Sequence, residues 1–397
     1  MILRSAILLL ILAASFIFPA DSSAEIKVLS SLEGKWPVDI EAEDDFLYTL
    51  DYAFRVWDIT DPKNIRKIGQ YDKAKDAIWQ AKPDFIKYEE GYGNPKGGGG
   101  ADYGGYNQIR GMGIGNFEGR KLAFIRCAHQ GIQVLDVTDP AHIFNMGGRP
   151  DLRKNIEVAD NAGKRIKVKG ENIFRTYWDG FQIFRYSSVA ALKNMGPYEY
   201  VSEIKRGGFG GAANDIKISE GNQYVYIAAD NTMDVYDISN VWAPICIYTY
   251  NNIRRPYQKI ENKGICVATG NNLLFLGTSK DLRIFDISDM RKIKTLTDAA
   301  GKEVIYPSSG SVLDIKIYKN YAFLYYGPTE VTKSSPETGL EIVDISDPRE
   351  PKFVDAFILG KTDRTDVARK MALIPKKGIV IIGVDAFYVL DVSDYIK

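Results

Sequence analysis

The sequence is poor in the residues on which metal and redox enzymes depend. Its 397 residues include only two histidines, His129 and His142, and three cysteines. Histidine-rich metal centres need more ligands than this. The chain also lacks a Gly-x-Ser-x-Gly nucleophile elbow, a Cys-x-x-Cys-His haem-attachment motif and a phosphate-binding glycine loop. We therefore predict no bound metal and no cofactor.

An excess of charge of either sign is also absent. The chain has 51 basic and 51 acidic residues, so its formal net charge is zero. Proteins that bind nucleic acid or anionic membrane surfaces carry a basic patch or a basic excess. The composition therefore gives no reason to expect a nucleic-acid partner.

Long apolar runs are missing, except near the N-terminus. Arg4 precedes an apolar run over Ala6–Phe18, and small residues follow up to Ala24. This pattern is typical of a cleaved signal peptide over residues 1–24. The run is shorter than the roughly 20 residues of a membrane span, although an uncleaved anchor is the alternative. We expect an exported protein, periplasmic, cell-surface or extracellular, with no membrane insertion after cleavage.

One short pattern recurs through the rest of the chain. A β-rich run ends in Asp, Ile or Val, Ser or Thr, and a second acidic or amide residue, as in Leu282–Asp289. One copy, Phe181–Ser188, has lost its aspartate. The marker positions are Asp58, Asp136, Arg185, Asp237, Asp286, Asp344 and Asp391. Five of the six spacings fall between 47 and 58 residues, close to the length of a four-stranded propeller blade.

The unit around Asp237 predicts the order of strands within a blade. Strands are expected at Asp215–Ile218, Tyr224–Ala229, Met233–Ile238 and Ile245–Tyr250, with turn residues between them. The two middle strands are apolar on both faces. A sheet packed between two neighbouring sheets needs this pattern.

The two ends of the chain predict a closed ring. The last repeat ends after its third strand, whereas Glu25–Leu32 forms an unassigned strand before the first blade. Pairing the two would complete a seventh blade and remove the open edges. We therefore predict an all-β fold: a seven-bladed β-propeller over residues 25–397, closed by the N-terminal strand, with a Gly/Tyr-rich insertion at 71–107. The alternative is an open solenoid.

The repeats resemble the LVIVD-repeat family. Gly339–Asp344 and Phe387–Asp391 match its pattern best, and Phe181–Ser188 departs from it by losing the aspartate. The resemblance implies a propeller on an exported or surface protein and says little about biochemistry.

The repeated aspartate has two interpretations. The side chain can accept N–H groups of the following turn and so form a hydrogen-bonded corner. It could instead belong to a ring of carboxylates that binds cations such as Ca²⁺. Because a single site does not need six copies, we favour the corner.

The three cysteines complete the structural expectations. Cys246 falls on an outer strand and Cys266 on an inner strand of the next blade, about three strand spacings from that blade's edge. A disulfide requires much closer Cα atoms. An odd number of cysteines also leaves at least one thiol unpaired. We expect buried, unpaired cysteines, Cys127 included.

Long connections are expected on one face of the ring. They are residues 71–107, 147–164, 297–310 and 327–338, whereas all connections on the other face are expected to be short. Long loops on a rigid scaffold commonly carry binding sites. The 71–107 segment could be a partner-binding arm or a spacer. The aromatic residues that could bind a partner on this face are Trp79, Tyr103, Tyr106, Tyr177 and Trp178.

The first strand of each blade is expected to line the central channel. The aligned first positions are Asp39, Arg110, Arg165, Asp215, Gly264, Asp314 and Lys370. They could form a ring of ion pairs that neutralise one another. They could instead form a ligand-binding mouth, in which arginines grip a carboxylate or phosphate and the three aspartates act as acid, base or cation ligands.

Two functions follow from these observations. The first is a non-catalytic platform that binds an envelope or extracellular protein or glycan through the long-loop face. The alternative is a hydrolase or lyase that acts on a carbohydrate or other small polar substrate. Two axial carboxylates about 5–9.5 Å apart across a cleft would favour glycosidase-type chemistry. A channel mouth filled by ion pairs would favour the platform.

Overall fold

The computed structural model describes most of the chain after residue 24. The described residues are 25–33, 38–51, 53–72, 109–127, 131–149, 165–177, 180–186, 188–189, 198–205, 212–251, 262–328, 337–361, 370–384 and 386–396. The predicted signal peptide and most of the 71–107 insertion lie outside them. Within them, no helix is long and apolar enough to cross a membrane.

The described strands form seven antiparallel sheets, each a blade whose strands run in order from the ring axis outward. Blade 1 comprises β2 (Asp39–Glu43), β3 (Phe46–Leu50), β4 (Ala53–Asp58) and β5 (Arg66–Asp72). Blade 2 comprises β6 (Ile109–Phe117), β7 (Arg120–Cys127), β8 (Gly131–Asp136) and β9 (Phe144–Arg149). Blade 3 comprises β10 (Ile166–Lys169), β11 (Asn172–Tyr177), β12 (Gly180–Tyr186) and β13 (Tyr198–Lys205). Blades 4 and 5 are β14 (Ala213–Ile218), β15 (Tyr224–Ala229), β16 (Thr232–Asp237), β17 (Ile245–Asn251); and β18 (Gly264–Gly270), β19 (Leu273–Thr278), β20 (Asp281–Asp286), β21 (Lys294–Thr295), β22 (Ile305–Pro307). Blades 6 and 7 are β23 (Ser311–Tyr318), β24 (Tyr321–Gly327), β25 (Glu337–Asp344), β26 (Lys352–Lys361); and β27 (Met371–Ile374), β28 (Ile379–Gly383), β29 (Phe387–Asp391), β1 (Lys27–Leu32).

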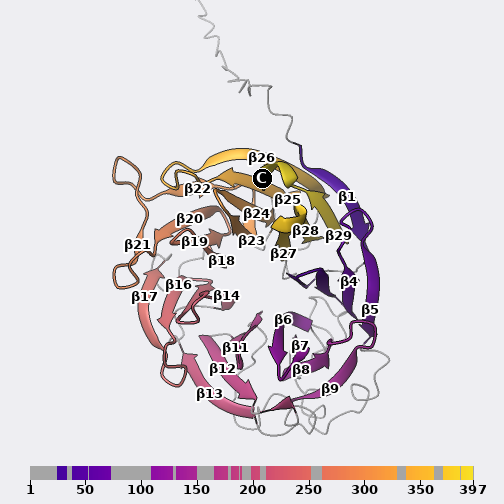
Figure 1. Cartoon of the computed structure of the whole chain (residues 1–397). Helices are drawn as coiled ribbons and strands as arrows, with labels where there is room; N and C mark the ends of the chain where they lie inside the picture. Colours follow the sequence, from indigo (N-terminus) through magenta and orange to yellow (C-terminus); the bar gives the residue numbers. More distant parts are fainter. Residues whose placement is uncertain are drawn as a thin grey trace, which may run out of the picture.

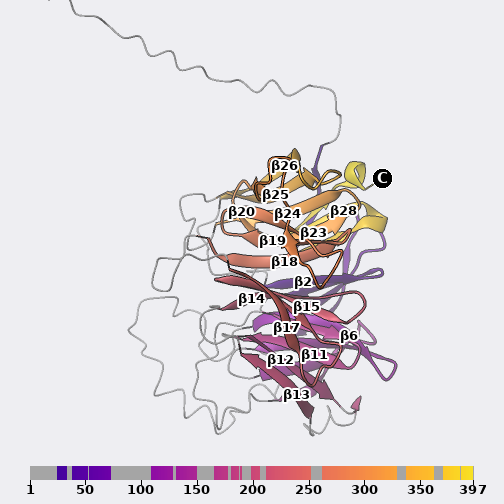
Figure 2. The ribbon, with the colours of Figure 1, turned by 90° about the vertical axis from the view of Figure 1, so that its left-hand side faces the viewer.

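The blades are arranged in a closed ring (Figure 1). Their inner strands contact one another in the order β2, β6, β10, β14, β18, β23 and β27, and β27 returns to β2. Figure 2 shows the ring from its edge. This arrangement confirms the predicted seven-bladed propeller.

The N-terminal strand closes the ring as predicted. β1 pairs antiparallel with β29, from Lys27 opposite Asp391 to Leu32 opposite Phe387. Figure 1 shows β1 in indigo beside β29 in yellow. Closure removes the free sheet edge that an open array would leave at the last blade.

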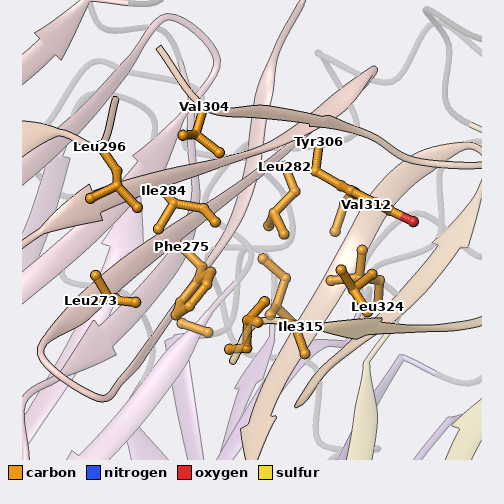
Figure 3. Packing of buried hydrophobic residues seen from close by; sticks show 14 of the residues in the cluster. Leu273, Phe275, Leu282, Ile284, Leu296, Val304, Tyr306, Val312, Ile315 and Leu324 are labelled. Atoms are coloured by element: carbon orange, nitrogen blue, oxygen red, sulfur yellow. The ribbon is translucent and has the colours of Figure 1, made fainter. Parts of the chain in front are cut away.

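Apolar side chains fill the space between blades. Seven buried clusters occur among the described residues, one between each pair of neighbouring blades. Figure 3 shows the cluster between blades 5 and 6, where Phe275 and Ile284 face Ile315 and Leu324. The interface between blades 7 and 1 is packed in the same way, with Ile381 and Val389 against Leu47 and Trp57. The ring closure is therefore as apolar as the other interfaces.

The repeated aspartate forms the predicted hydrogen-bonded corner. In all six intact copies its Oδ1 accepts the N–H two residues later, at 2.7–3.0 Å. The fourth residue of the pattern does the same for the next turn in five copies, as at Asp289, whose Oδ1 accepts Arg291 N–H at 3.0 Å. These bonds satisfy turn amides that no strand partner reaches.

Three expectations about the outer parts of the blades are wrong. Residues 297–310 are not simply a loop between blades, because β22 returns to pair with β20 beyond β21. Not every connection on the corner face is short, because residues 187–197 separate β12 from β13. Cys246 is exposed, since nothing in the described chain covers the outer strand β17. Cys266 is buried as expected, and both thiols are free.

Candidate functional site: a charged cluster on the ring axis

Strand pairing defines which residues occupy equivalent places around the axis. Asp39 lies opposite Leu50, Asp215 opposite Ala228, and Asp314 opposite Tyr325. The same register in all seven blades gives Asp39, Gly111, Arg165, Asp215, Cys266, Asp314 and Lys370. The alignment of Arg110 was therefore wrong by one residue and that of Gly264 by two.

An irregularity in the inner strands explains both errors. The register shifts immediately before the ring position in β6, β14, β18 and β23. A bulge inserts one residue without a partner and changes which side chains face the axis. Arg110 lies in the bulge of β6, and its side chain is outside the described residues.

Gly264 has a packing role instead. A Cβ at this position would lie 2.5 Å from the Ala229 carbonyl oxygen. The Asn214 side-chain amide donates to the Gly264 carbonyl at 2.8 Å. Glycine therefore allows β18 to lie directly against the end of the neighbouring blade.

Lys370 is the centre of the charged cluster. Its Nζ lies 3.0 Å from Asp215 Oδ2 and 3.0 Å from Asp314 Oδ1. All three side chains are at least nine-tenths buried. Burial by itself disfavours the ammonium, but Asp215 and Asp314 outweigh it and raise the pKa of Lys370. The lysine remains charged and bridges three blades.

The three predicted aspartates also join neighbouring blades through the backbone. Asp39 Oδ2 accepts Met112 N–H at 2.9 Å, and Asp314 Oδ2 accepts Met371 N–H at 2.9 Å. Asp215 Oδ2 accepts Val267 N–H at 3.2 Å. Each aspartate thus holds the inner strand of the next blade.

The pKa of Asp314 is held well below its ordinary value. Burial would raise it, but the Lys316 and Lys370 ammoniums and the Met371 N–H together have the larger effect. A carboxyl that stays ionised far into acid cannot serve as a general acid near neutral pH.

Arg165 is less completely satisfied than Lys370. Its Nε lies 3.5 Å from Asp215 Oδ1, and its side chain is 5 % exposed. Arg165 Nε and Nη1 and Asp215 Oδ1 are buried without a hydrogen-bond partner in the described chain. Buried polar groups in native proteins are nearly always hydrogen-bonded, so these three atoms are exceptional.

A second layer of charged residues, which was not predicted from the sequence, lies two positions farther along the inner strands. It contains Glu41, Lys167, Lys217 and Lys316. Lys167 forms an ion pair with Glu41, and Lys316 Nζ lies 3.3 Å from Asp314 Oδ2. Alternate side chains of a strand share a face, so counting two residues onward from Asp39 or Asp215 would have identified this layer.

The buried thiol of Cys266 completes the axial ring. Its Sγ lies 3.4 Å from the Val312 carbonyl oxygen, and burial raises its pKa well above the ordinary value. It is therefore an apolar, protonated member of the ring rather than a reactive nucleophile.

Of the aromatic residues predicted to bind a partner, only Tyr177 is described. It is buried at the end of β11, and its hydroxyl donates to the Ile204 carbonyl at 2.9 Å. It thus stabilises the contact between two strands of blade 3. Trp79, Tyr103, Tyr106 and Trp178 lie outside the described residues.

Comparisons with known proteins support the fold and the repeats. The LVIVD repeat family matches residues 210–252 and 336–357. No curated protein matches the sequence significantly. Two similar solved structures are the β-propeller domain of Cps50 (Swd1) from Myceliophteria thermophila and the periplasmic gluconolactonase PpgL from Pseudomonas aeruginosa.

Both structural likenesses concern the fold alone. The Cps50 domain has 9 % identity and a TM-score of 0.53, with 93 % of this chain and 100 % of the domain covered. For PpgL the identity is 11 % and the TM-score 0.55, with 84 % and 88 % covered. The protein is therefore a seven-bladed β-propeller, two segments of which match the LVIVD repeat.

Proposed function

We propose that this protein is an exported, non-catalytic propeller that binds a protein or glycan partner in the envelope or outside the cell. The partner would bind the face that carries the long connections between blades. The observation that supports this proposal most directly is the use of the axial carboxylates. Lys370 lies between Asp215 and Asp314, and the backbone of the next blade occupies an oxygen of each aspartate.

The same geometry argues against the enzymatic alternative. A glycosidase pair needs one carboxyl with a raised pKa and a second that is free to act on the substrate or on a water molecule. Asp314 has a lowered pKa, and both oxygens of Asp39 accept backbone N–H groups. The resemblance to a gluconolactonase is limited to the fold at 11 % identity, so its activity is not transferred to this chain.

The lengths of the connections favour one face of the disc for binding. On the corner face, the first two strands of a blade are joined by very short turns, such as residues 44–45, 118–119 and 271–272. On the other face, residues 73–108 separate β5 from β6, and 150–165 separate β9 from β10. A rigid scaffold with long connections on one side commonly binds through that side.

Export rests on the sequence. The apolar run before Ala24 is typical of a signal peptide, and the LVIVD repeats match a family found on exported proteins. An envelope or extracellular protein or glycan would then be accessible to the ring.

The test is capture of partners from the native envelope by cross-linking. The first variant replaces residues 74–107 with a glycine–serine linker of equal length, so that the connection remains and its chemistry is removed. The matched control carries Arg291→Glu and Lys292→Glu in a turn of the opposite face. We expect a partner to be captured by the wild type and by the control, but not by the linker variant.

Two results would contradict the proposal. The first is equal capture of the same partner by the linker variant. The second is turnover of a glycoside or lactone that disappears in an Asp215→Asn variant whose fold is intact, because this would show that the axial carboxylates are catalytic.

A further inference from the structure

The charges around the axis do not balance. In the two axial layers, the described residues comprise four carboxylates, Asp39, Glu41, Asp215 and Asp314, and five cations, Arg165, Lys167, Lys217, Lys316 and Lys370. Four of the cations lie within 4 Å of a carboxylate. Lys217 has no such carboxylate in the described chain.

The surroundings of Lys217 are those of a cation that lacks a counter-charge. Although its side chain is reached by solvent, the surrounding protein lowers its pKa first by desolvation. Repulsion from Lys316 and Lys167 lowers the pKa further, and Asp215 and Asp314 only partly oppose this effect. The three lysines occupy the second axial layer, on the inner strands β10, β14 and β23 of blades 3, 4 and 6.

Glycines in blade 2 help to bring these charges together. A Cβ on Gly115 would lie 2.4 Å from Val168 Cγ1, and one on Gly113 would lie 3.1 Å from Val168 Cγ2. Because these two glycines lack side chains, β10 can pack closely against β6. Lys167 of blade 3 can then pair with Glu41 of blade 1 across the intervening blade.

Arg165 supplies a second, independent observation. It lies two residues before Lys167 on the neighbouring inner strand, and its Nε and Nη1 are buried without a hydrogen-bond partner among the described residues. Asp215 Oδ1, beside it, is an acceptor that is equally unsatisfied. A ligand that accepts hydrogen bonds and also carries a hydroxyl would satisfy both kinds of atom.

We propose that Lys217 and Arg165, supported by Lys167 and Lys316, form a binding site for a small oxyanion of the phosphate or carboxylate class. The anion balances the excess axial cation and accepts hydrogen bonds from the ammonium and the guanidinium. Charge-assisted hydrogen bonds of this kind are the strong ones in proteins. A protonated oxygen of hydrogen phosphate, or the hydroxyl of a hydroxy acid, donates to Asp215 Oδ1.

The site is distinct from the 73–108 connection, which is the segment that the partner-binding test replaces. Lys217 is near the end of β14 that leads into the short turn to β15, on the corner face of the ring. Arg165 lies at the other end of its inner strand, directly before β10 and after the connection from β9. Replacement of residues 74–107 should leave anion binding unchanged, so the two proposals can fail independently.

The experiment is isothermal titration of the full mature chain with inorganic phosphate, and separately with malate, at constant ionic strength in chloride. The two titrations distinguish a phosphate from a carboxylate ligand. Lys217→Gln should weaken binding by about ten-fold or more, the value of one charge-assisted hydrogen bond. Lys217→Arg should retain binding. Lys352→Gln removes the same charge from the outer strand β26 and should have no effect.

Thermal unfolding of each variant provides the control for folding, and stabilisation by phosphate provides a second measurement of binding. The proposal is overturned if neither anion binds the wild type more tightly than chloride does. It is also overturned if Lys217→Gln and Lys352→Gln, both folded, bind the anion equally well.

Discussion

Two sets of aspartates in this propeller have different structural roles. Five of the six corner aspartates are partly exposed to solvent, and the sixth, Asp136, is buried. Each of the six accepts the backbone N–H two residues later in the chain. The three axial aspartates are buried, and each accepts an N–H from the next blade. The first set shapes a turn, whereas the second set holds blades together.

The contrast explains why one set repeats and the other does not. A corner aspartate needs only its own turn, so every blade can use the same solution. An axial aspartate needs particular neighbours, such as Lys370 for Asp215 and Asp314. Seven aspartates around one axis would repel one another. They would also be buried without cations to pair with, which is costly. The ring therefore mixes acids, bases, glycine and cysteine.

The largest expected effect comes from removing the central cation. Lys370→Met leaves two buried carboxylates without their shared ammonium, and we expect the free energy of unfolding to fall by about 3–5 kcal/mol. Urea denaturation followed by circular dichroism measures the change. Lys316→Met is the matched control, because that side chain is 38 % exposed. Its cost should be below about 1 kcal/mol.

A compensated variant sharpens this prediction. Asp215→Asn and Asp314→Asn added to Lys370→Met remove both stranded charges and should recover much of the lost stability. A single Lys370→Met variant as stable as the wild type would show that the axial ion pairs do not hold the blades.

The corner aspartates should give a smaller effect. Asp286→Ala removes the acceptor for Ser288 N–H, at 3.0 Å, in a turn that solvent can partly satisfy. We expect a loss of about 0.5–1.5 kcal/mol in the free energy of unfolding. Asp286→Asn keeps an acceptor oxygen and should cost less. If the two substitutions destabilise equally, the hydrogen bond is not the reason for the aspartate.

The smallest expected effect is on how the free energy of unfolding depends on pH in the acid range. Hydrogen bonds from the Thr60 side chain and N–H, followed by the Arg66 guanidinium, lower the pKa of Asp58 to about 2. A depressed folded-state pKa contributes stability above the unfolded pKa of about 3.9. That contribution is lost as the pH falls toward the folded value of about 2. The unfolding free energy, measured from pH 5 down to pH 2, should therefore decline less steeply for Asp58→Asn than for the wild type.

The repeat pattern was sufficient to predict most of the fold. The strand Tyr224–Ala229 has the predicted bounds, and Ile245–Asn251 extends the prediction by one residue. The closure of blade 7 by β1 was also correct. These features follow from periodicity and apolar pattern, which each blade carries in its own sequence. The split outer edge of blade 5 was missed because the pairing of β22 with β20 spans an excursion that has no periodic signal.

The axial site was only partly predictable. Asp39, Arg165, Asp215, Asp314 and Lys370 lie where the alignment placed them, whereas bulges displaced the positions of Arg110 and Gly264. A bulge cannot be recognised in a pattern of short strands, because it changes which side chains face the axis without changing the amino-acid composition of the strand. The second layer was missed for a simpler reason, since only the first residue of each inner strand had been aligned.

The sequence by itself determined the number of blades, the order of strands and the corner turns, because each depends on residues close together in the chain. The tertiary structure alone decided which charges meet at the axis. Lys370 meets Asp215 across 155 positions and Asp314 across 56. Such partners are set by the geometry of the closed ring. In the part of the chain that the structure describes, this geometry also leaves Lys217 without a carboxylate within ion-pair distance.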